Sequence, residues 1–405
     1  MKNQKIIIIG GGQAACQTAT TLKNLGHTGE ISIFCSENYL PYQRPPLSKK
    51  FLLGELEKER LFFKPEKFYH ENDIKLNLNT YVEQIDKKNK QIIFKGNKKE
   101  YYDDLVIATG TSPRKIQSDV ENPKNIYYLR SIDDVLEIKN KVNNSKKVVI
   151  IGGGYIGLEV AAIINKLGLD VTIIEMADRI LERVTSQKIS NFYTKVHNEV
   201  GVEILTNTSV QSLISTNKGV EILTSNGTIE ADFIVVGIGV IPCDKLALDA
   251  GLDVDNGIVV DEFCSTSDKN IFSAGDCTYH PNAFYKKNIR LESVHNAIEQ
   301  GKTVASSILG QKKAYDQIPW FWSDQYDLKL QIAGLFGDYN DVIVRGDINK
   351  KSFAIFYMNN ENMIASDCIN RPAEHMMSRK IISERIIIDK LKLEDDSIPI
   401  KEIIN

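Results

Sequence analysis

The sequence predicts an α/β protein with two similar strand–helix–strand units and a C-terminal α+β unit. Two glycine-rich turns, at residues 10–15 and 152–157, each follow an apolar strand-like run and precede a run of helix length. Beyond residue 320 the pattern changes to consecutive short strand-like runs separated by polar turns. The chain has 405 residues, and at about 150 residues per domain this length favours two or three domains.

Charge and hydropathy exclude several classes of protein. The chain has 50 Lys and Arg against 53 Asp and Glu, whereas a general nucleic-acid binder is expected to be strongly basic. The longest apolar runs, 148–158 and 234–242, are much shorter than the roughly 20 residues of a membrane helix. The N-terminal apolar run leads directly into the first glycine-rich turn, which disfavours a signal peptide. We therefore expect a globular protein of the cytoplasm.

The cysteines give no local metal or redox motif. All six lie more than ten residues apart, at positions Cys16, Cys35, Cys243, Cys264, Cys277 and Cys368. Scattered thiols are typical of buried positions in a reducing compartment. Because neither the cysteines nor the six histidines show ligand spacing, we predict no metal site.

The two glycine-rich turns belong to repeated units. The first unit reads as a strand at 5–9, the turn, a helix and a strand at 31–34. The second reads as a strand at 148–151, the turn, a helix that Gly168 ends, and a strand at 171–174. Strand, glycine-rich turn, helix and strand form the βαβ unit that binds dinucleotides.

Small residues in each turn have separate roles. The first permits the tight turn, the next lets the backbone approach a pyrophosphate, and the third keeps the helix close to the sheet. In the two copies these residues are Gly10 and Gly152, Gly12 and Gly154, and Ala15 and Gly157. The helix N-terminus that follows offers N–H groups and a positive dipole end to the phosphates.

An acidic residue after the second strand of each unit would bind a ribose. Glu175 follows the strand of the second copy, at the expected distance of about 20 residues from the turn. A carboxylate there repels the additional phosphate of NADP, so we predict a preference for NAD(H). Arg179 is the one feature against this preference, although Asp178 and Glu182 beside it favour a solvated charge. In the first copy the acid, Glu37, comes slightly later.

Further strands and one helix complete the predicted fold. Apolar strands at 105–110, 233–237 and 270–277 end in small residues. In the tail, strands are expected at 330–335, 341–345, 353–357 and 363–368, with a helix at 373–385 after Pro372.

These motifs resemble the FAD-dependent ferredoxin and rubredoxin reductase family. Residues 10–15, 108–110, 152–157 and 274–276 resemble flavoprotein reductases with two dinucleotide folds. Residues 41–49, 152–159, 290–294 and 319–325 are similar to the ferredoxin reductase branch, and the likeness covers essentially the whole chain.

The resemblance implies a glutathione-reductase-like architecture with two Rossmann-like domains and a C-terminal α+β domain. The FAD domain would comprise residues 1–112 and 240–318, the NAD domain 113–239, and the C-terminal domain 319–405.

The resemblance also implies the cofactor-binding residues. Those expected to contact FAD are Gly10, Gly12, Ala14, Ala15, Ser36, Glu37, Arg44, Lys49, Val82, Ala108, Thr109, Gly110, Arg130, Asp276, Val294 and Trp322. The ribose partner is either Ser36 or Glu37. Those expected to contact NADH are Gly152, Gly153, Gly154, Tyr155, Ile156, Glu159, Glu175 and Gly239. The two expected at the reacting rings are Lys49 and Glu159; the alternative for Glu159 is a charge that only stabilises its helix N-terminus.

The implied activity is hydride transfer from NADH to FAD, followed by transfer of single electrons to a [2Fe–2S] ferredoxin or a rubredoxin that serves a cytochrome P450 or an aromatic-ring oxygenase. Unpaired cysteines argue against a disulfide reductase. Alternatives are an NADH oxidase, another small-molecule-reducing flavoenzyme, or a redox interaction protein resembling apoptosis-inducing factor. Candidate docking residues for the acidic partner are Lys286, Lys287, Arg290, Lys302 and Trp322.

Overall fold

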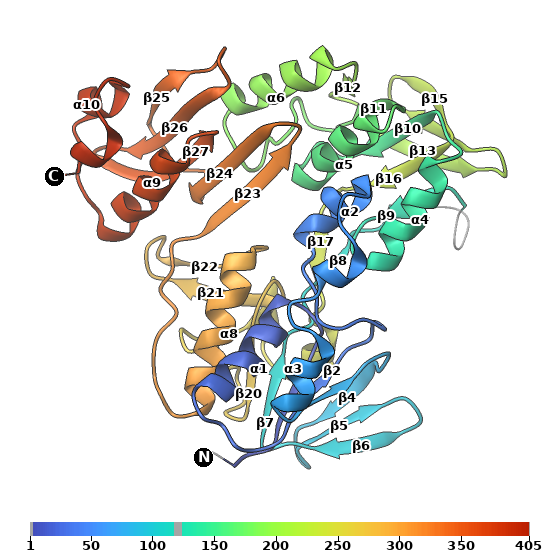
Figure 1. Ribbon diagram of the computed structural model, residues 1–405, viewed down its shortest axis with the longest axis vertical. Helices are drawn as coiled ribbons and strands as arrows, with labels where there is room; N and C mark the ends of the chain where they lie inside the picture. The colour runs from blue at the N-terminus through green and yellow to red at the C-terminus, as the bar shows by residue number, and fades with distance from the viewer. Residues whose placement is uncertain (1–2, 117–123, 405) are drawn as a thin grey trace. The chain divides into compact units, whose positions relative to one another are not determined.

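The computed structural model describes residues 3–116 and 124–404 (Figure 1). The chain forms two compact units. The first unit comprises Met1–Arg44, Lys58–Ser112 and Ile241–Pro319, and the second comprises Pro45–Glu57, Pro113–Val240 and Trp320–Asn405. The predicted division into an FAD, an NAD and a C-terminal domain stays a prediction.

A five-stranded parallel sheet is the centre of the first unit. Its strand order is β20-β7-β1-β2-β3, with bounds Ile271–Ser273, Asp104–Ile107, Ile6–Ile9, Ile31–Phe34 and Ile74–Asn77. In the register of β1, Ile6 lies opposite Ile31 on one side and Asp104 on the other. Helix α1 (Gln13–Asn24) connects β1 to β2, so the first predicted βαβ unit is confirmed.

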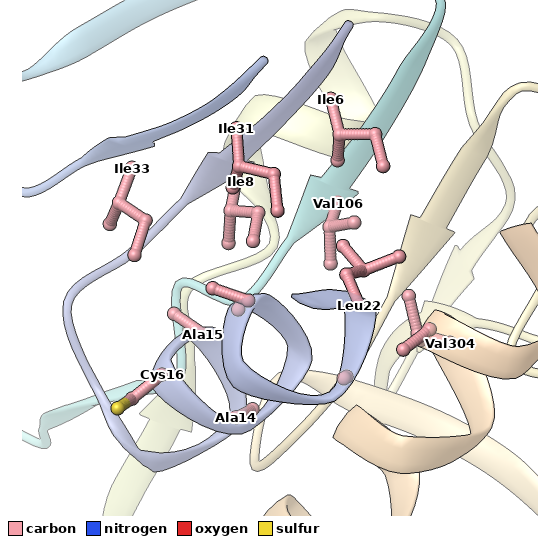
Figure 2. Packing of buried hydrophobic residues seen from close by; sticks show 14 of the residues in the cluster. Ile6, Ile8, Ala14, Ala15, Cys16, Leu22, Ile31, Ile33, Val106 and Val304 are labelled. Carbon is pink, nitrogen blue, oxygen red and sulfur yellow. The ribbon is translucent and has the colours of Figure 1, made fainter. Parts of the chain in front are cut away.

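Alternate apolar residues of this sheet form the core beneath α1. Ile8 and Ile33 point from the sheet toward Ala15 and Leu22 of the helix (Figure 2). Ile8 and Leu22 are fully buried. Removing a side chain of this size from water contributes about 2 kcal/mol. Helix α8 (Val294–Ile308) lies beside α1, and its Val304 closes the same cluster (Figures 1 and 2).

The remaining elements of the first unit are antiparallel or short. A three-stranded sheet comprises β4 (Val82–Asp86), β5 (Gln91–Phe94) and β6 (Lys98–Tyr101). A four-stranded sheet comprises β18 (Val254–Asp255), β19 (Gly257–Val259), β21 (Thr278–Asn282) and β22 (Lys287–Ile289). The helices are η2 (Lys58–Leu61), α3 (Glu66–Glu71) and α7 (Lys245–Asp249). The chain passes between the units in β8 (Thr111–Pro113) and β17 (Val240–Pro242).

The second unit also contains a five-stranded parallel sheet. Its order is β12-β11-β10-β16-β9, with bounds Glu203–Leu205, Asp170–Ile174, Lys147–Ile151, Phe233–Val236 and Ile126–Tyr128. Helix α5 (Tyr155–Lys166) connects β10 to β11, which confirms the second predicted βαβ unit. Gly168 has φ +90° just beyond this helix, as its predicted role requires. The accompanying elements are η1 (Pro45–Ser48), α2 (Lys50–Leu53), α4 (Ile132–Val142), α6 (Gln187–Glu199), β13 (Val210–Ser215), β14 (Val220–Thr224) and β15 (Gly227–Ala231).

The C-terminal part of the second unit is an antiparallel sheet with a helix, which confirms the predicted α+β unit. Its order is β23-β24-β27-β26-β25, with bounds Trp320–Gln325, Leu328–Gly334, Asn362–Ile369, Ser352–Asn359 and Asp341–Asp347. Helix α9 (Pro372–Glu384) lies against it (Figure 1). The chain continues through α10 (Lys390–Glu394) and η3 (Ile400–Glu402). The buried Arg345 donates to the carbonyls of Leu393, Asp395 and Ile398, which attaches this last segment to β25.

The helices of the described residues are all too short or too polar to cross a membrane.

Candidate functional site

The first glycine-rich turn leaves no room for a side chain at its start. Gly10 has φ +127°, and a Cβ there would lie 2.1 Å from the carbonyl oxygen of Ala108. The ends of β1 and β7 therefore meet at these two residues. At Gly12, by contrast, a Cβ would meet no described atom within 4 Å. The turn is thus closed toward the sheet and open on the side where α1 begins.

The second turn shows the same arrangement. Gly152 has φ +108°, and its Cβ would lie 2.4 Å from the carbonyl oxygen of Gly237. A Cβ at Gly157 would lie 2.1 Å from the carbonyl oxygen of Gly152, which explains the close approach of α5 to its strand. At Gly154 a Cβ would again meet no described atom within 4 Å.

The helix N-termini at these turns fit dinucleotide phosphates. Gly12 and Gly154 are the N-cap residues of α1 and α5, and neither helix has a side-chain cap hydrogen bond. In α4, by contrast, Ser131 accepts from the N–H of Asp134, and the Asp134 carboxylate accepts from the N–H of Ser131. N–H groups without a cap, facing open space at a positive dipole end, suit an anion. The residues present therefore fit a dinucleotide at each turn.

Glu175 lies beside the second turn. Its Oε2 accepts from the N–H of Gly153 at 2.7 Å, and its Oε1 accepts from the N–H of Ala177 at 2.9 Å. These bonds fix the carboxylate at the carboxyl end of β11, next to the glycine-rich loop. An ionised carboxylate at this position can still accept further hydrogen bonds, such as those of a ribose.

Arg179 is held by its own loop. Its guanidinium donates to the carbonyls of Thr185 and Glu182, at 3.0 and 2.9 Å, and to Oγ of Ser190 at 2.6 Å. The sequence suggested a solvated charge at this position; instead, the side chain ties residues 179–190 together.

A buried ion pair joins the two residues predicted at the reacting rings. Lys49 Nζ lies 2.6 Å from Oε2 of Glu159, and the two side chains are 15% and 5% exposed. The same carboxylate oxygen accepts from Oγ of Ser48 at 2.5 Å, while Oε1 accepts from Oγ of Ser323 at 2.7 Å. Glu159 is therefore a hydrogen-bonded partner of Lys49, in addition to a charge in the first half of α5.

Glu37 has partners of its own at the end of β2. Its Oε1 accepts from Arg44 at 2.6 Å, and its Oε2 accepts from the Tyr42 hydroxyl at 2.5 Å. Burial opposes the charge of Arg44, but Tyr42 and Glu37 outweigh it and raise the pKa of Arg44. Ser36, the other candidate for the ribose, is exposed. Both residues therefore stay candidates.

The other residues expected at FAD occupy varied positions. Val82 is buried in the core cluster with Phe34, at the start of β4. The hydroxyl of Thr109 donates to the carbonyl of Cys243 at 2.7 Å, and Gly110 has φ +67°. Four more predicted residues lie on loops or helix starts of their own units: Ala14 and Val294 in the first turns of α1 and α8, Asp276 after β20, and Arg130 before α4.

Three residues expected at NADH, and Trp322, which is expected at FAD, lie in the second unit. The Tyr155 hydroxyl is buried without a hydrogen-bond partner among the described residues, whereas Ile156 is 44% exposed. Gly239 has φ +102°, and its carbonyl accepts from the N–H of Arg114. The ring of Trp322 lies 5.6 Å from that of Trp320, on β23.

The docking candidates differ in how far their charges are neutralised. Arg290 pairs with Glu292, and Lys302 pairs with Glu299, each at 2.7 Å. Lys286 and Lys287 are exposed, and among the described residues neither forms an ion pair. These two lysines lie on the β21–β22 hairpin beside a pocket of about 560 Å³ whose lining also includes Glu262 and Asp316.

The six cysteines, all described, are unpaired. Five are buried and Cys243 is half-buried. Burial raises the pKa of Cys35 to about 11 and also raises the pKa values of Cys264 and Cys277. Thiols of this kind are poor nucleophiles, since thiolate is the reactive form.

Several buried polar residues were not predicted. His197 and Gln325 form a hydrogen bond of 2.9 Å. Asp367 accepts from the hydroxyls of Thr185 and Tyr357, and burial raises its pKa to about 6. The one available signal was the motif at 319–325, which contains Gln325 and Ser323.

The chain matches two family models. The model described as pyridine nucleotide-disulphide oxidoreductase covers residues 4–301, and the model described as reductase C-terminal covers residues 320–404.

Curated relatives and solved structures agree with this match. Putidaredoxin reductase of Pseudomonas putida is 39% identical, over 99% of this chain and 97% of that protein. Rubredoxin-NAD(+) reductase of Ectopseudomonas oleovorans is 38% identical, over 91% of this chain and 96% of that protein. The reductase in a crystal structure of the covalent putidaredoxin reductase–putidaredoxin complex is 38% identical, with a TM-score of 0.96 and coverage of 99% and 98%.

These matches confirm the fold class and the family resemblance that the motifs predicted. The chain belongs to the pyridine nucleotide-disulphide oxidoreductases with a reductase C-terminal domain and, among these flavin oxidoreductases, to the NAD(P)H-dependent ferredoxin and rubredoxin reductase family.

Proposed function

We propose that the chain is an NADH-dependent ferredoxin reductase. It takes a hydride from NADH onto FAD and passes single electrons to a [2Fe–2S] ferredoxin or a rubredoxin, which serves a cytochrome P450 or an aromatic-ring oxygenase. The observation that carries the proposal is the buried Lys49–Glu159 pair beside the second glycine-rich helix. Support for the acceptor comes from relatives whose names state a putidaredoxin or a rubredoxin partner.

The first glycine-rich turn would hold the FAD pyrophosphate. The N–H groups at the start of α1, with Gly12 as N-cap, would donate to the phosphates, because the helix has no side-chain cap there. Ser36 or Glu37 would bind the ribose at the end of β2. Bound FAD supplies the chemistry: it accepts two electrons as a hydride and releases them one at a time.

The Lys49–Glu159 pair would act where nicotinamide and flavin meet. Lys49 would present its ammonium group to the isoalloxazine edge, while Glu159 would hold that group in place and contact the nicotinamide. Hydride transfer needs no general base, so the residues contribute alignment and a fixed charge distribution. A buried carboxylate with an ammonium group and two hydroxyl donors is already ordered before the cofactors meet.

Glu175 and Arg179 together favour NADH over NADPH. The Glu175 carboxylate would accept from the ribose hydroxyls and repel a 2′-phosphate. Arg179, a nearby cation that could compensate, already donates to Thr185, Glu182 and Ser190.

Electrons would leave the chain for an external carrier. The cysteines are unpaired, and burial raises the pKa of five of them. A disulfide relay within the chain is therefore disfavoured. An NADH oxidase or a redox interaction protein would share the cofactor sites, so the rate of transfer to each acceptor distinguishes these alternatives.

The hairpin lysines Lys286 and Lys287 would form part of the docking surface for an acidic acceptor. We expect the double variant Lys286→Glu/Lys287→Glu to raise KM for the acceptor about tenfold at low ionic strength, and the effect to shrink at about 0.5 M salt. The double variant Lys95→Glu/Lys269→Glu, at two other exposed lysines of the first unit, is the matched control. An equal effect of both changes would place the docking surface elsewhere.

A further inference from the structure

A chain of hydrogen bonds leads from Glu159 to the side of the second unit where α6 lies. The Ser323 hydroxyl lies 2.7 Å from Oε1 of Glu159, and Nε2 of Gln325 lies 3.2 Å from the same hydroxyl. Oε1 of Gln325 lies 2.9 Å from Nε2 of His197, and Nδ1 of His197 lies 3.0 Å from the Tyr326 hydroxyl. Ser323, Gln325 and His197 are buried, with exposures of 0%, 1% and 0%.

The donors in this chain all point toward Glu159. The carbonyl oxygen of Gln325 can only accept, so Nε2 of His197 carries the hydrogen. Burial lowers the pKa of His197, against the bond to Gln325, which raises it. In the neutral ring Nδ1 therefore accepts from the Tyr326 hydroxyl. The Gln325 amide then donates to Ser323, whose own hydrogen is left for the carboxylate.

The direction of the bonds gives the histidine a definite effect on the carboxylate. With its carbonyl bound by His197, the Gln325 side chain presents its NH₂ group to Ser323 and cannot present its oxygen. The Ser323 hydroxyl then has its oxygen occupied and its hydrogen directed at Oε1. Successive hydrogen bonds polarise one another in a buried setting, so the donor that reaches Glu159 is strengthened.

We propose that His197 is a positioning residue for hydride transfer. Acting through Gln325 and Ser323, it holds a donor on Oε1 of Glu159 and leaves Oε2 for Lys49. The inference rests on the proposed function, because it assumes that Glu159 acts at the nicotinamide. It also assigns a role to the 319–325 motif, because Ser323 and Gln325 of this motif connect His197 to Glu159.

The same series of hydrogen bonds is unsuited to moving protons. A primary amide in the middle of a relay would have to pass through its imidic acid form, and the bonds would have to reverse direction. His197 therefore acts on the orientation and charge of Glu159 and does not serve as a route for the flavin proton.

The surroundings of Glu159 determine what loss of the donor does. Lys49 contacts the carboxylate, and Glu159 also acts electrostatically on the hydroxyls of Tyr155 and Tyr193, on α5 and α6, whose pKa values burial raises well above the ordinary range. Loss of the Ser323 donor leaves Oε1 without its hydroxyl, so flavin reduction should slow, and a new donor to Gln325 should restore the rate.

The test is a double-mutant cycle with two readouts, and both should be non-additive: the rate at which saturating NADH reduces the FAD-loaded enzyme in rapid mixing, and the free energy of unfolding of the apoprotein. We expect Ser323→Ala and His197→Phe each to slow flavin reduction about fivefold. The double variant should be no slower than Ser323→Ala, because both changes remove the same donor. His197→Gln, which restores an N–H donor to Gln325, should recover most of the rate.

Two further variants keep the outcomes distinguishable. His27→Phe removes a buried histidine of the first unit and should leave the rate of flavin reduction unchanged, whatever it does to stability. If Glu159→Gln does not slow flavin reduction, the proposed role of Glu159 fails. If Glu159→Gln is slow but His197→Phe leaves the rate of flavin reduction unchanged, or its effect adds fully to that of Ser323→Ala, the role of His197 is overturned while the proposed function stands.

Discussion

Lys49 and Glu159 are 110 positions apart in the sequence, yet their side chains form an ion pair of 2.6 Å with little solvent exposure. Lys49 is the N-cap residue of the short helix α2, whereas Glu159 lies on α5. Removing one member of a buried pair leaves an uncompensated charge, which costs more than removing both. The pair therefore links the stability of the second unit to its proposed chemistry.

Lys49→Met should lower the free energy of unfolding by about 3 kcal/mol, because it leaves the Glu159 carboxylate buried with hydroxyl donors only. The double variant Lys49→Met/Glu159→Gln should recover much of that loss. Denaturant titration of the three proteins measures the difference. Equal stabilities for Lys49→Met and the double variant would show that Glu159 carries no unpaired charge in the single variant.

Glu175→Ala should raise the ratio of NADPH to NADH activity about tenfold, since it removes the carboxylate that repels a 2′-phosphate. Arg179→Ala should leave this ratio close to that of the parent, because the guanidinium is bound to its own loop. Steady-state kcat/KM values for both nucleotides give the ratios. A large fall in NADPH activity in Arg179→Ala would show that Arg179 reaches the phosphate after all.

Gly152→Ala should abolish tight NADH binding and destabilise the fold, because its Cβ would lie 2.4 Å from the carbonyl oxygen of Gly237. Gly168→Ala is the matched control: Gly168 has φ +90°, but a Cβ there meets no described atom within 4 Å. That change should cost only about 1 kcal/mol of backbone strain. Thermal unfolding and NADH titration compare the two variants. Similar losses of stability and of NADH affinity would mean that the positive φ, and not the contact with Gly237, causes the effect.

The stability of the second unit should depend on pH through Asp367. Burial raises the pKa of this carboxyl from 3.8 to about 6, against the hydroxyls of Thr185 and Tyr357, which donate to it and lower its pKa. A raised pKa in the folded state means that its contribution is fully present below about pH 4 and is lost as the pH rises through about 6.

Relative to the parent, Asp367→Asn should therefore gain up to about 3 kcal/mol between about pH 4 and pH 7. Unfolding free energies of both proteins across this range provide the measurement. A difference that does not change with pH would show that Asp367 titrates normally. Because Asp367 accepts from Thr185, close to the N-terminus of α6, the same variant also tests how α6 is held to β27.

Local signals predicted the repeated units well. The strand at 31–34 has the expected bounds, and helix α9 (Pro372–Glu384) is displaced by one residue from the expected 373–385. Glycine turns, apolar runs and a helix-starting proline act over a few residues, so the sequence shows them directly. The antiparallel sheets β4–β6 and β13–β15 were not predicted, because their strands are short and half-exposed and, except in β14, do not alternate regularly between buried and exposed residues.

Long-range polar contacts could not be predicted in the same way. Family motifs indicated Lys49 and Glu159 separately, but no local pattern places Ser323 or Gln325 against them. His197 has no motif at all; its role depends on α6 packing near β23, which is decided by the fold of the entire second unit.

The central claim is that NADH reduces the bound flavin and that electrons then leave the chain to an iron–sulfur or rubredoxin acceptor. The most direct measurement is anaerobic rapid mixing of the FAD-loaded protein with NADH, followed by mixing with a panel of [2Fe–2S] ferredoxins and rubredoxins. We expect fast bleaching of the flavin and then one-electron reduction of at least one acceptor, faster than reoxidation by oxygen in a parallel experiment. Slow bleaching by NADH, or rapid turnover with oxygen and no transfer to any acceptor, would contradict the account.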